Sequence, residues 1–156
     1  MSVEHEYDLE SRLCAMRYFS KPENYARYPG HVVADKSEGI FTANVIDCCV
    51  LILLGKHQNA LSHYNLEAGH QPGVYIPEML SRIDENAQMQ AYIIGGDQEH
   101  VDLIQSELSR ERIALLGTFV EDWTPGKGKF KDIALDGQYR KIILAVNRNA
   151  FLIASY

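Results

Sequence analysis

Residues 50–54, Val-Leu-Ile-Leu-Leu, constrain the fold of this chain more than any other segment. Five consecutive aliphatic side chains are typical of a strand that is covered on both faces. Residues 55–59 begin with a glycine and predict a turn, and residues 60–66 predict the returning strand. We therefore expect a β-hairpin inside a sheet, with other elements packed on both of its faces.

The other elements mix helices and strands without strict alternation. Helical spacing predicts a helix over residues 10–19 that turns Cys14 toward the core, and Pro77 and Asp97 are each expected to open a further helix. Strands are expected at residues 31–35, 39–43, 89–94, 113–120, 129–135, 139–146 and 151–155. The pattern predicts one α+β domain over residues 1–156 with a large mixed sheet.

Composition narrows the class of protein. A net charge of -6 and the lack of a basic run argue against a general nucleic-acid binder. The apolar runs are too short to cross a bilayer, and the acidic start does not resemble a signal peptide. We expect a cytoplasmic protein, or one delivered to another cytosol by a non-classical route. The three cysteines should be reduced, and the spacing of Cys and His predicts no metal and no other cofactor.

Cys48 and Cys49 stand directly before the aliphatic strand, and His63 lies in the returning strand. A thiol and an imidazole on neighbouring strands suit nucleophilic catalysis, because the imidazole takes the thiol proton. A structural alternative exists for each residue. A Cys at the start of a buried strand is often a small core residue, and Thr42 fits a strand on propensity alone.

These segments resemble the CheD family of protein-glutamine deamidases, and the wider group of cysteine deamidases that includes the catalytic domain of cytotoxic necrotizing factor. The CheD pattern is a strand ending in Thr, then Leu-Gly-Ser-Cys-Val, an apolar strand, a turn and Gly-x-Ala-His-x-x-Leu-Pro. The matching segments here are Ile40-Phe41-Thr42, Val45-Ile46-Asp47-Cys48, Leu61-Ser62-His63-Tyr64-Asn65-Leu66 and, for a later strand ending in Gly-Gly, Ala91-Tyr92-Ile93-Ile94-Gly95-Gly96. The resemblance makes residues 31–147 the core and residues 1–30 an N-terminal extension.

The resemblance implies two packed mixed sheets with outer helices and a site at the strand mouth. It also implies that His63 draws the proton from the cysteine, and that the thiolate attacks the side-chain amide of a glutamine exposed on a protein substrate. Thr42 would orient the imidazole. Ammonia would leave, and water would cleave the thioester, whereas an amine in place of water would give transglutamination. A chemotaxis role and a toxin-like or effector-like role fit equally.

Three questions stay open from the residues. Alignment from Thr42 places the nucleophile at Cys48, whereas pairing Leu54 with Ala60 would put Cys49 on the face of His63. Ile46-Asp47 replaces the Gly-Ser of the family, so a catalytically decayed protein-binding module is the alternative function. The aromatic residues of the N-terminal extension form either core cover or a partner-docking surface: Tyr18, Phe19, Tyr25 and Tyr28.

Overall fold

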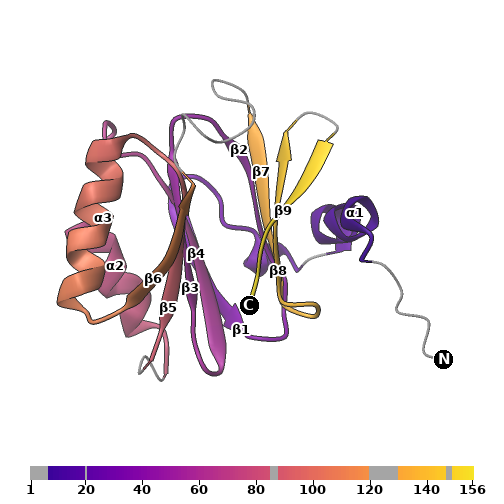
Figure 1. The fold of residues 1–156 in the computed structure, drawn as a ribbon, viewed down its shortest axis with the longest axis horizontal. Helices are drawn as coiled ribbons and strands as arrows, with labels where there is room; N and C mark the ends of the chain where they lie inside the picture. Colours follow the sequence, from indigo (N-terminus) through magenta and orange to yellow (C-terminus); the bar gives the residue numbers. More distant parts are fainter. Residues whose placement is uncertain (1–6, 20, 85–87, 120–129, 147–148) are drawn as a thin grey trace.

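The computed structural model describes residues 7–19, 21–84, 88–119, 130–146 and 149–156, and it is built in layers. Two helices, a five-stranded sheet, a four-stranded sheet and a third helix follow one another across the molecule (Figure 1). In chain order the elements are α1 (Leu9–Phe19), the short 3-10 helix η1 (Pro22–Asn24), β1 (Gly30–Asp35), β2 (Ile40–Val45), β3 (Cys49–Leu54), β4 (Gln58–Tyr64), α2 (Pro72–Ser81), β5 (Gln90–Gly95), α3 (Gln98–Arg110), β6 (Ala114–Phe119), β7 (Lys131–Asp136), β8 (Lys141–Val146) and β9 (Asn149–Ser155).

The strands form two sheets, with orders β1-β4-β3-β5-β6 and β2-β7-β8-β9. This confirms a layered α+β fold with two sheets and outer helices, as the resemblance implies, whereas the single large mixed sheet expected from the element pattern alone is wrong. Only the five-stranded sheet is mixed, because β5 and β6 are parallel and every other strand pair is antiparallel. The turn between β1 and β2 carries the chain from one sheet to the other: β1 pairs with β4, whereas β2 pairs with β7.

The aliphatic strand β3 lies at the centre of the five-stranded sheet, and all six of its residues are buried, as its sequence predicts. Alternate side chains serve different layers because successive side chains of a strand point to opposite faces. Val50, Ile52 and Leu54 pack between the two sheets. Leu51 and Leu53 pack instead with the apolar faces of α2 and α3. The central hairpin therefore holds three layers of the molecule together.

Two helix predictions fare differently. Asp97 caps α3 as expected, with its Oδ1 accepting from the backbone N–H of His100 at 2.8 Å. The prediction that Pro77 opens a helix is wrong, because α2 begins at Pro72 and Pro77 lies inside it. Pro72 is the better start, since the first helical residue needs no N–H donor. Cys14 is exposed rather than core-facing, while its neighbour Leu13 packs on the four-stranded sheet.

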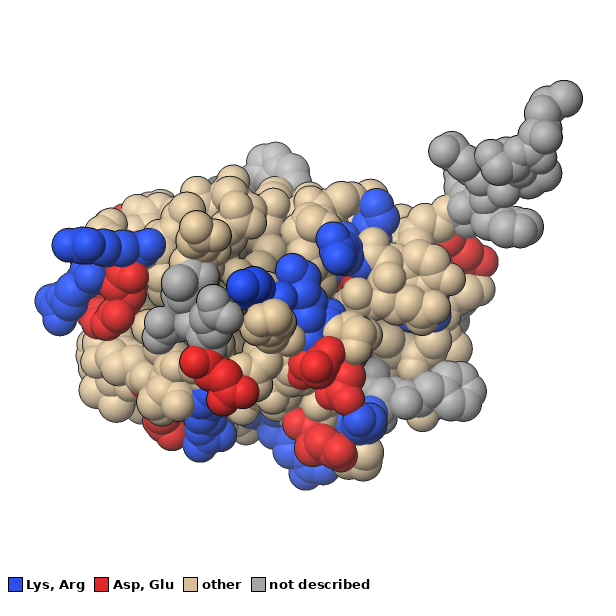
Figure 2. All heavy atoms as spheres, turned by 90° about the horizontal axis from the view of Figure 1, so that it is seen from below, with Lys and Arg blue, Asp and Glu red and all other residues tan. Residues whose placement is uncertain are grey.

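The surface seen from below the view of Figure 1 carries both signs of charge. Lys and Arg side chains alternate there with Asp and Glu side chains (Figure 2). A field of one sign, which a nucleic-acid-binding face requires, does not extend over that end of the molecule. None of the described helices is long and apolar enough to span a membrane.

Candidate active site

His63 occupies the middle strand of a three-strand group, and its side chain is only 1% exposed. Its Cα lies opposite Gly30 of β1 on one side and Val50 of β3 on the other. The imidazole points into the space between the sheets, where Nδ1 lies 2.8 Å from Oγ1 of Thr42 in β2. This contact joins the two sheets and brings together Thr42 and His63, the two residues that the resemblance pairs.

The hydrogen bonds of Thr42 fix the tautomer of His63. The Thr42 hydroxyl lies 2.7 Å from the backbone carbonyl oxygen of Ala26, which can only accept. The single hydroxyl proton is therefore donated to Ala26, and Oγ1 must accept from Nδ1–H of His63. Neutral His63 consequently carries its proton on Nδ1, and Nε2 is the free base. Nε2 is buried and has no hydrogen-bond partner among the described residues.

The register of the central hairpin decides which cysteine shares a face with His63. Leu54 pairs with Asn59 rather than with Ala60, because the turn is closed by the Gly55 N–H to Gln58 carbonyl bond at 3.0 Å. The expected pairing was one residue too long, and a shift of one residue reverses the face. The parity argument for Cys49 is therefore wrong.

Cys49 lies on the helix side of the sheet, fully buried, with its Sγ 3.6 Å from the carbonyl oxygen of Gly95. Burial, followed by the charges of Asp97 and Cys48, raises the pKa of its thiol far above the usual range. Cys48 precedes β3 and lies on the inter-sheet side, with Val50 and Leu61. The structure thus brings Cys48, and not Cys49, to the side of the sheet that holds His63.

Cys48 and His63 line the same cavity, which has a volume of about 560 Å³. Further lining residues come from the segment before β1, from β2 and from the end of β4: Tyr25, Arg27, Tyr28, Asn44 and Asn65. The ring of Tyr28 lies 5.2 Å from that of His63 and 5.7 Å from that of His70, and the residue is 45% exposed. Tyr28 therefore forms a wall between the imidazole and solvent.

The thiol and the imidazole are both neutral in this arrangement. Burial, followed by the carboxylate of Asp47, raises the pKa of Cys48 to about 11. Burial lowers the pKa of His63 to about 4. Because His63 Nε2 has no partner among the described residues, the thiol is not hydrogen-bonded to it. The pair consists of a nucleophile and a free base beside one cavity, without a preformed thiolate–imidazolium ion pair.

Gly95 and Gly96, at the end of β5, lie directly against the backbone and side chains of Cys48 and Cys49. A Cβ on Gly95 would lie 2.9 Å from the carbonyl oxygen of Cys48, and a Cβ on Gly96 would lie 2.8 Å from Cβ of Cys49. Both glycines also have a left-handed backbone, with φ of 76° and 80°. The Gly-Gly pair therefore has a physical reason at this position, since only glycine lets this strand end approach the cysteines so closely.

Sequence reasoning missed two asparagines of the cavity. Asn44 has a φ of 59° and lies where the β2–β7 register shifts, between Thr42 and Val45. Asn65 follows β4 and lines the cavity, and its Oδ1 accepts from the Glu67 N–H at 2.9 Å, while no described residue accepts from its side-chain amide N–H groups. In the sequence, the only sign is an Asn at the end of a predicted strand. This signal is weak, because Asn also adopts a left-handed backbone in many ordinary turns.

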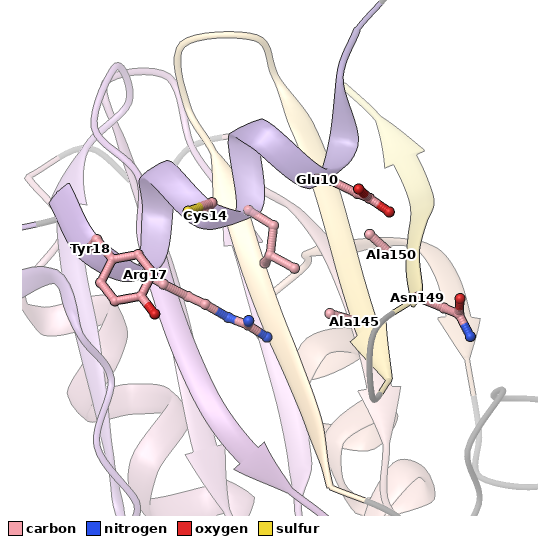
Figure 3. Close-up of a pocket in the computed structure, with 8 residues that line it drawn as sticks. Glu10, Cys14, Arg17, Tyr18, Ala145, Asn149 and Ala150 are labelled. Atoms are coloured by element: carbon pink, nitrogen blue, oxygen red, sulfur yellow. The ribbon is translucent and has the colours of Figure 1, made fainter.

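A second cavity, of about 400 Å³, lies between α1 and the β8–β9 hairpin on the outer side of the four-stranded sheet (Figure 3). Cys14 lies there beside Arg17, with Ala145 and Ala150 on the sheet below. No histidine of the described residues lines this cavity, so its thiol has no imidazole beside it. The first cavity is therefore the better candidate for cysteine chemistry.

The fold and this site define a layered α+β protein with a thiol, a tautomer-fixed imidazole and an orienting hydroxyl at the interface of two sheets. No protein-family model matches the chain, and a search of curated proteins finds no match. Within the described ranges there is no group of three or more His, Cys, Asp or Glu residues that could hold a metal ion.

Proposed function

We propose that this chain is a cysteine-dependent protein-glutamine deamidase with a CheD-like fold. The observation that carries the proposal is the hydrogen-bond chain from Ala26 through Thr42 to His63, because it leaves Nε2 as a base beside the cavity that Cys48 lines. An orienting acceptor on Nδ1 and a free Nε2 are what a thiol nucleophile requires of its histidine.

The reaction begins when a glutamine side chain enters the cavity. His63 Nε2 takes the proton of Cys48, and the thiolate attacks the carboxamide carbon to give a tetrahedral oxyanion. Backbone N–H groups of residues 47–49 are the nearest candidates to stabilise that charge. Protonated His63 then gives its proton to the leaving amine, so ammonia departs and a thioester remains. Water, deprotonated by His63, cleaves the thioester to glutamate and the free thiol.

The lining of the cavity suits an uncharged amide substrate. A carboxamide presents one acceptor and two donors, and Asn44 and Asn65 offer the complementary groups. No carboxylate of the described residues lines this cavity, and Asp47, which raises the pKa of Cys48, is the acidic side chain whose charge acts on the thiol. The neutral resting pair also fits general-base activation, in which proton transfer is coupled to attack on the bound substrate.

The alternative function is a protein-binding module whose site has decayed. The observation in its favour is the missing hydrogen bond between Cys48 and His63, together with the raised pKa of the thiol. A protein of this kind would bind a partner through the same cavity without turning it over. The sequence feature that favours this alternative is Ile46-Asp47, which stands before the cysteine where the CheD pattern has Gly-Ser.

Ammonia release from glutamine-containing peptides tests the proposal. The wild-type protein should release ammonia and convert glutamine to glutamate in the peptide mass spectrum. Cys48→Ala and His63→Gln should abolish the release. Cys49→Ala is the matched control, since it removes a thiol on the other face of the same sheet and should keep activity if the protein folds. Binding of a peptide without ammonia release would favour the decayed module, and release that survives Cys48→Ala would contradict the proposed nucleophile.

A further inference from the structure

The cavity lined by Cys48 and His63 adjoins another hollow on the surface, which is not the cavity beside Cys14. The two adjoining hollows share Tyr25 and Arg27, and the added hollow has a volume of about 380 Å³. It runs toward the end of α1, where Met16, Pro22 and Phe41 give it an apolar lining. A chain segment bound with one side chain at Cys48 can therefore extend along the surface into this hollow.

All charged residues that line the two hollows are basic. Arg17, Lys21 and Arg27 line them, and no Asp or Glu of the described chain does. We call this surface, from Arg27 to Arg17 and Lys21, the basic groove. Its sign is opposite to that of the whole molecule, which has a net charge of -6. A local field against the net charge is a feature of a surface that attracts a ligand of the opposite sign.

Arg27 is the cation most available to a ligand. Arg17 forms an ion pair with Asp132 and Lys21 forms one with Glu38, so their charges are partly used within the protein. Arg27 is exposed, and its guanidinium lies 5.8 Å from the centre of the Tyr25 ring. No carboxylate of the described residues pairs with it. It is also the one cation that both hollows share, next to the proposed chemistry.

From these observations we infer that the basic groove binds an acidic segment of the substrate protein beside the target glutamine. The inference rests on the proposed function, because it extends the substrate of the same site. Carboxylates are the natural partners of a guanidinium held on an aromatic ring. Single-stranded nucleic acid also binds arginines and aromatic rings, but a base offers no glutamine side chain to Cys48.

Peptide binding to Cys48→Ala tests the groove without any chemistry. The probes are fluorescent peptides with one glutamine flanked on both sides by aspartates, by serines or by lysines. The aspartate peptide should bind most tightly and the lysine peptide least tightly. Arg27→Gln should weaken the aspartate peptide about two- to fivefold, the range for one exposed ion pair. Arg27→Glu should reverse the order of the aspartate and lysine peptides.

The control is Arg110→Gln, which removes an exposed arginine of α3 on the opposite side of the five-stranded sheet and should change nothing. Equal binding of the three peptides, or an unchanged order in Arg27→Glu, would overturn the inference. Tighter binding of a single-stranded oligonucleotide of the same length would overturn it in favour of nucleic acid.

The two proposals fail separately. Ammonia release by the wild-type protein from N-acetylglutamine amide, which has no charged flank, reports on the chemistry alone. If the wild-type protein releases no ammonia from the small amide but binds the three peptides in the expected order, the deamidase proposal is contradicted and the acidic-ligand inference stands. If it releases ammonia but binds the three peptides equally, the deamidase proposal stands and the acidic-ligand inference is contradicted.

Discussion

Nδ1 of His63 donates a hydrogen bond to Oγ1 of Thr42 across the interface of two sheets, at 2.8 Å. The bond depends on a third group, the carbonyl of Ala26, which takes the hydroxyl proton and so forces Oγ1 to accept. Thr42 therefore links the two sheets by a hydrogen bond and fixes which ring nitrogen of His63 carries the proton. Because the contact serves both packing and catalysis, substitutions of Thr42 should affect the free energy of unfolding and the rate of ammonia release to different extents.

Replacing Thr42 tests this double role. Thr42→Val keeps the shape of the side chain but leaves Nδ1–H and the Ala26 carbonyl without their partner, so it should cost about 1–3 kcal/mol of unfolding free energy. Thr42→Ser keeps the hydroxyl and should lose little of the ammonia-release rate. Urea unfolding measures the first effect, and peptide deamidation by the folded variants measures the second. Equal activity of the Val and Ser variants would show that the hydroxyl does not orient His63.

The free energy of unfolding should fall in mild acid because of His63. Burial lowers its pKa to about 4 in the folded protein, from 6.5 in a free histidine. Between these values the unfolded chain binds a proton that the folded chain does not, so stability decreases as the pH falls through this window. A shift of this size corresponds to about 3 kcal/mol, and above the window His63 adds no pH dependence.

Urea unfolding of wild type and His63→Gln between about pH 7 and 4 isolates this contribution. Burial also lowers the pKa of His31 and His100, so both proteins should lose stability in acid. The wild type should lose about 3 kcal/mol more than the variant. Parallel curves for the two proteins would mean that His63 has the same pKa in the folded and unfolded states, and that burial does not lower it.

The three thiols should be alkylated in a fixed order. Cys14 is exposed and should react first with iodoacetamide, while Cys49 is fully buried and should react only after unfolding. Cys48 lines a cavity, but its pKa is raised to about 11, so its rate should be low near neutral pH and rise with each increase of pH toward that value. Peptide mapping after timed alkylation gives the order, and labelling of Cys49 before Cys48 would contradict the assignment of faces.

The sequence predicts most elements of the fold because their signals are local. The aliphatic run of β3 and the cap at Asp97 depend on neighbouring residues, and both lie where expected. The division into two sheets was expected from the resemblance alone and does not follow from local signals. Residues 35–38 look like an ordinary turn, and nothing in them says that the strand before pairs with β4 while the strand after pairs with β7.

The site was predictable in its members more than in its geometry. Thr42, Cys48 and His63 follow from the resemblance, and the structure places Thr42 and His63 in contact. Choosing between the cysteines from parity failed because it needs the register of the hairpin, and one residue of turn length reverses the face. For Tyr25 and Tyr28 the sequence left core cover and a docking surface open, and it did not place them at the cavity, because this segment is a loop that only tertiary packing brings to the site.

Gly96→Ala tests whether the end of β5 must approach the cysteines. The variant would strain a backbone at φ of 80° and place Cβ 2.8 Å from Cβ of Cys49. Gly69→Ala is the matched control, because Gly69 has a φ of 91° with nothing within 4 Å of a new Cβ. The control should lose about 1–2 kcal/mol from the left-handed backbone alone, and Gly96→Ala should lose clearly more. Equal losses by urea unfolding would show that the contact adds no constraint.

The most direct test of the account is to trap the nucleophile. A peptide in which a chloromethyl ketone replaces the carboxamide of glutamine alkylates a thiolate that is positioned for attack, and chloride leaves. In a Cys14→Ser background, peptide mapping by mass spectrometry should find the adduct on Cys48 alone, and His63→Gln should slow its formation strongly. An adduct on Cys49, or a Cys48 adduct that forms equally fast without His63, would contradict the assignment of Cys48 and His63 as nucleophile and base.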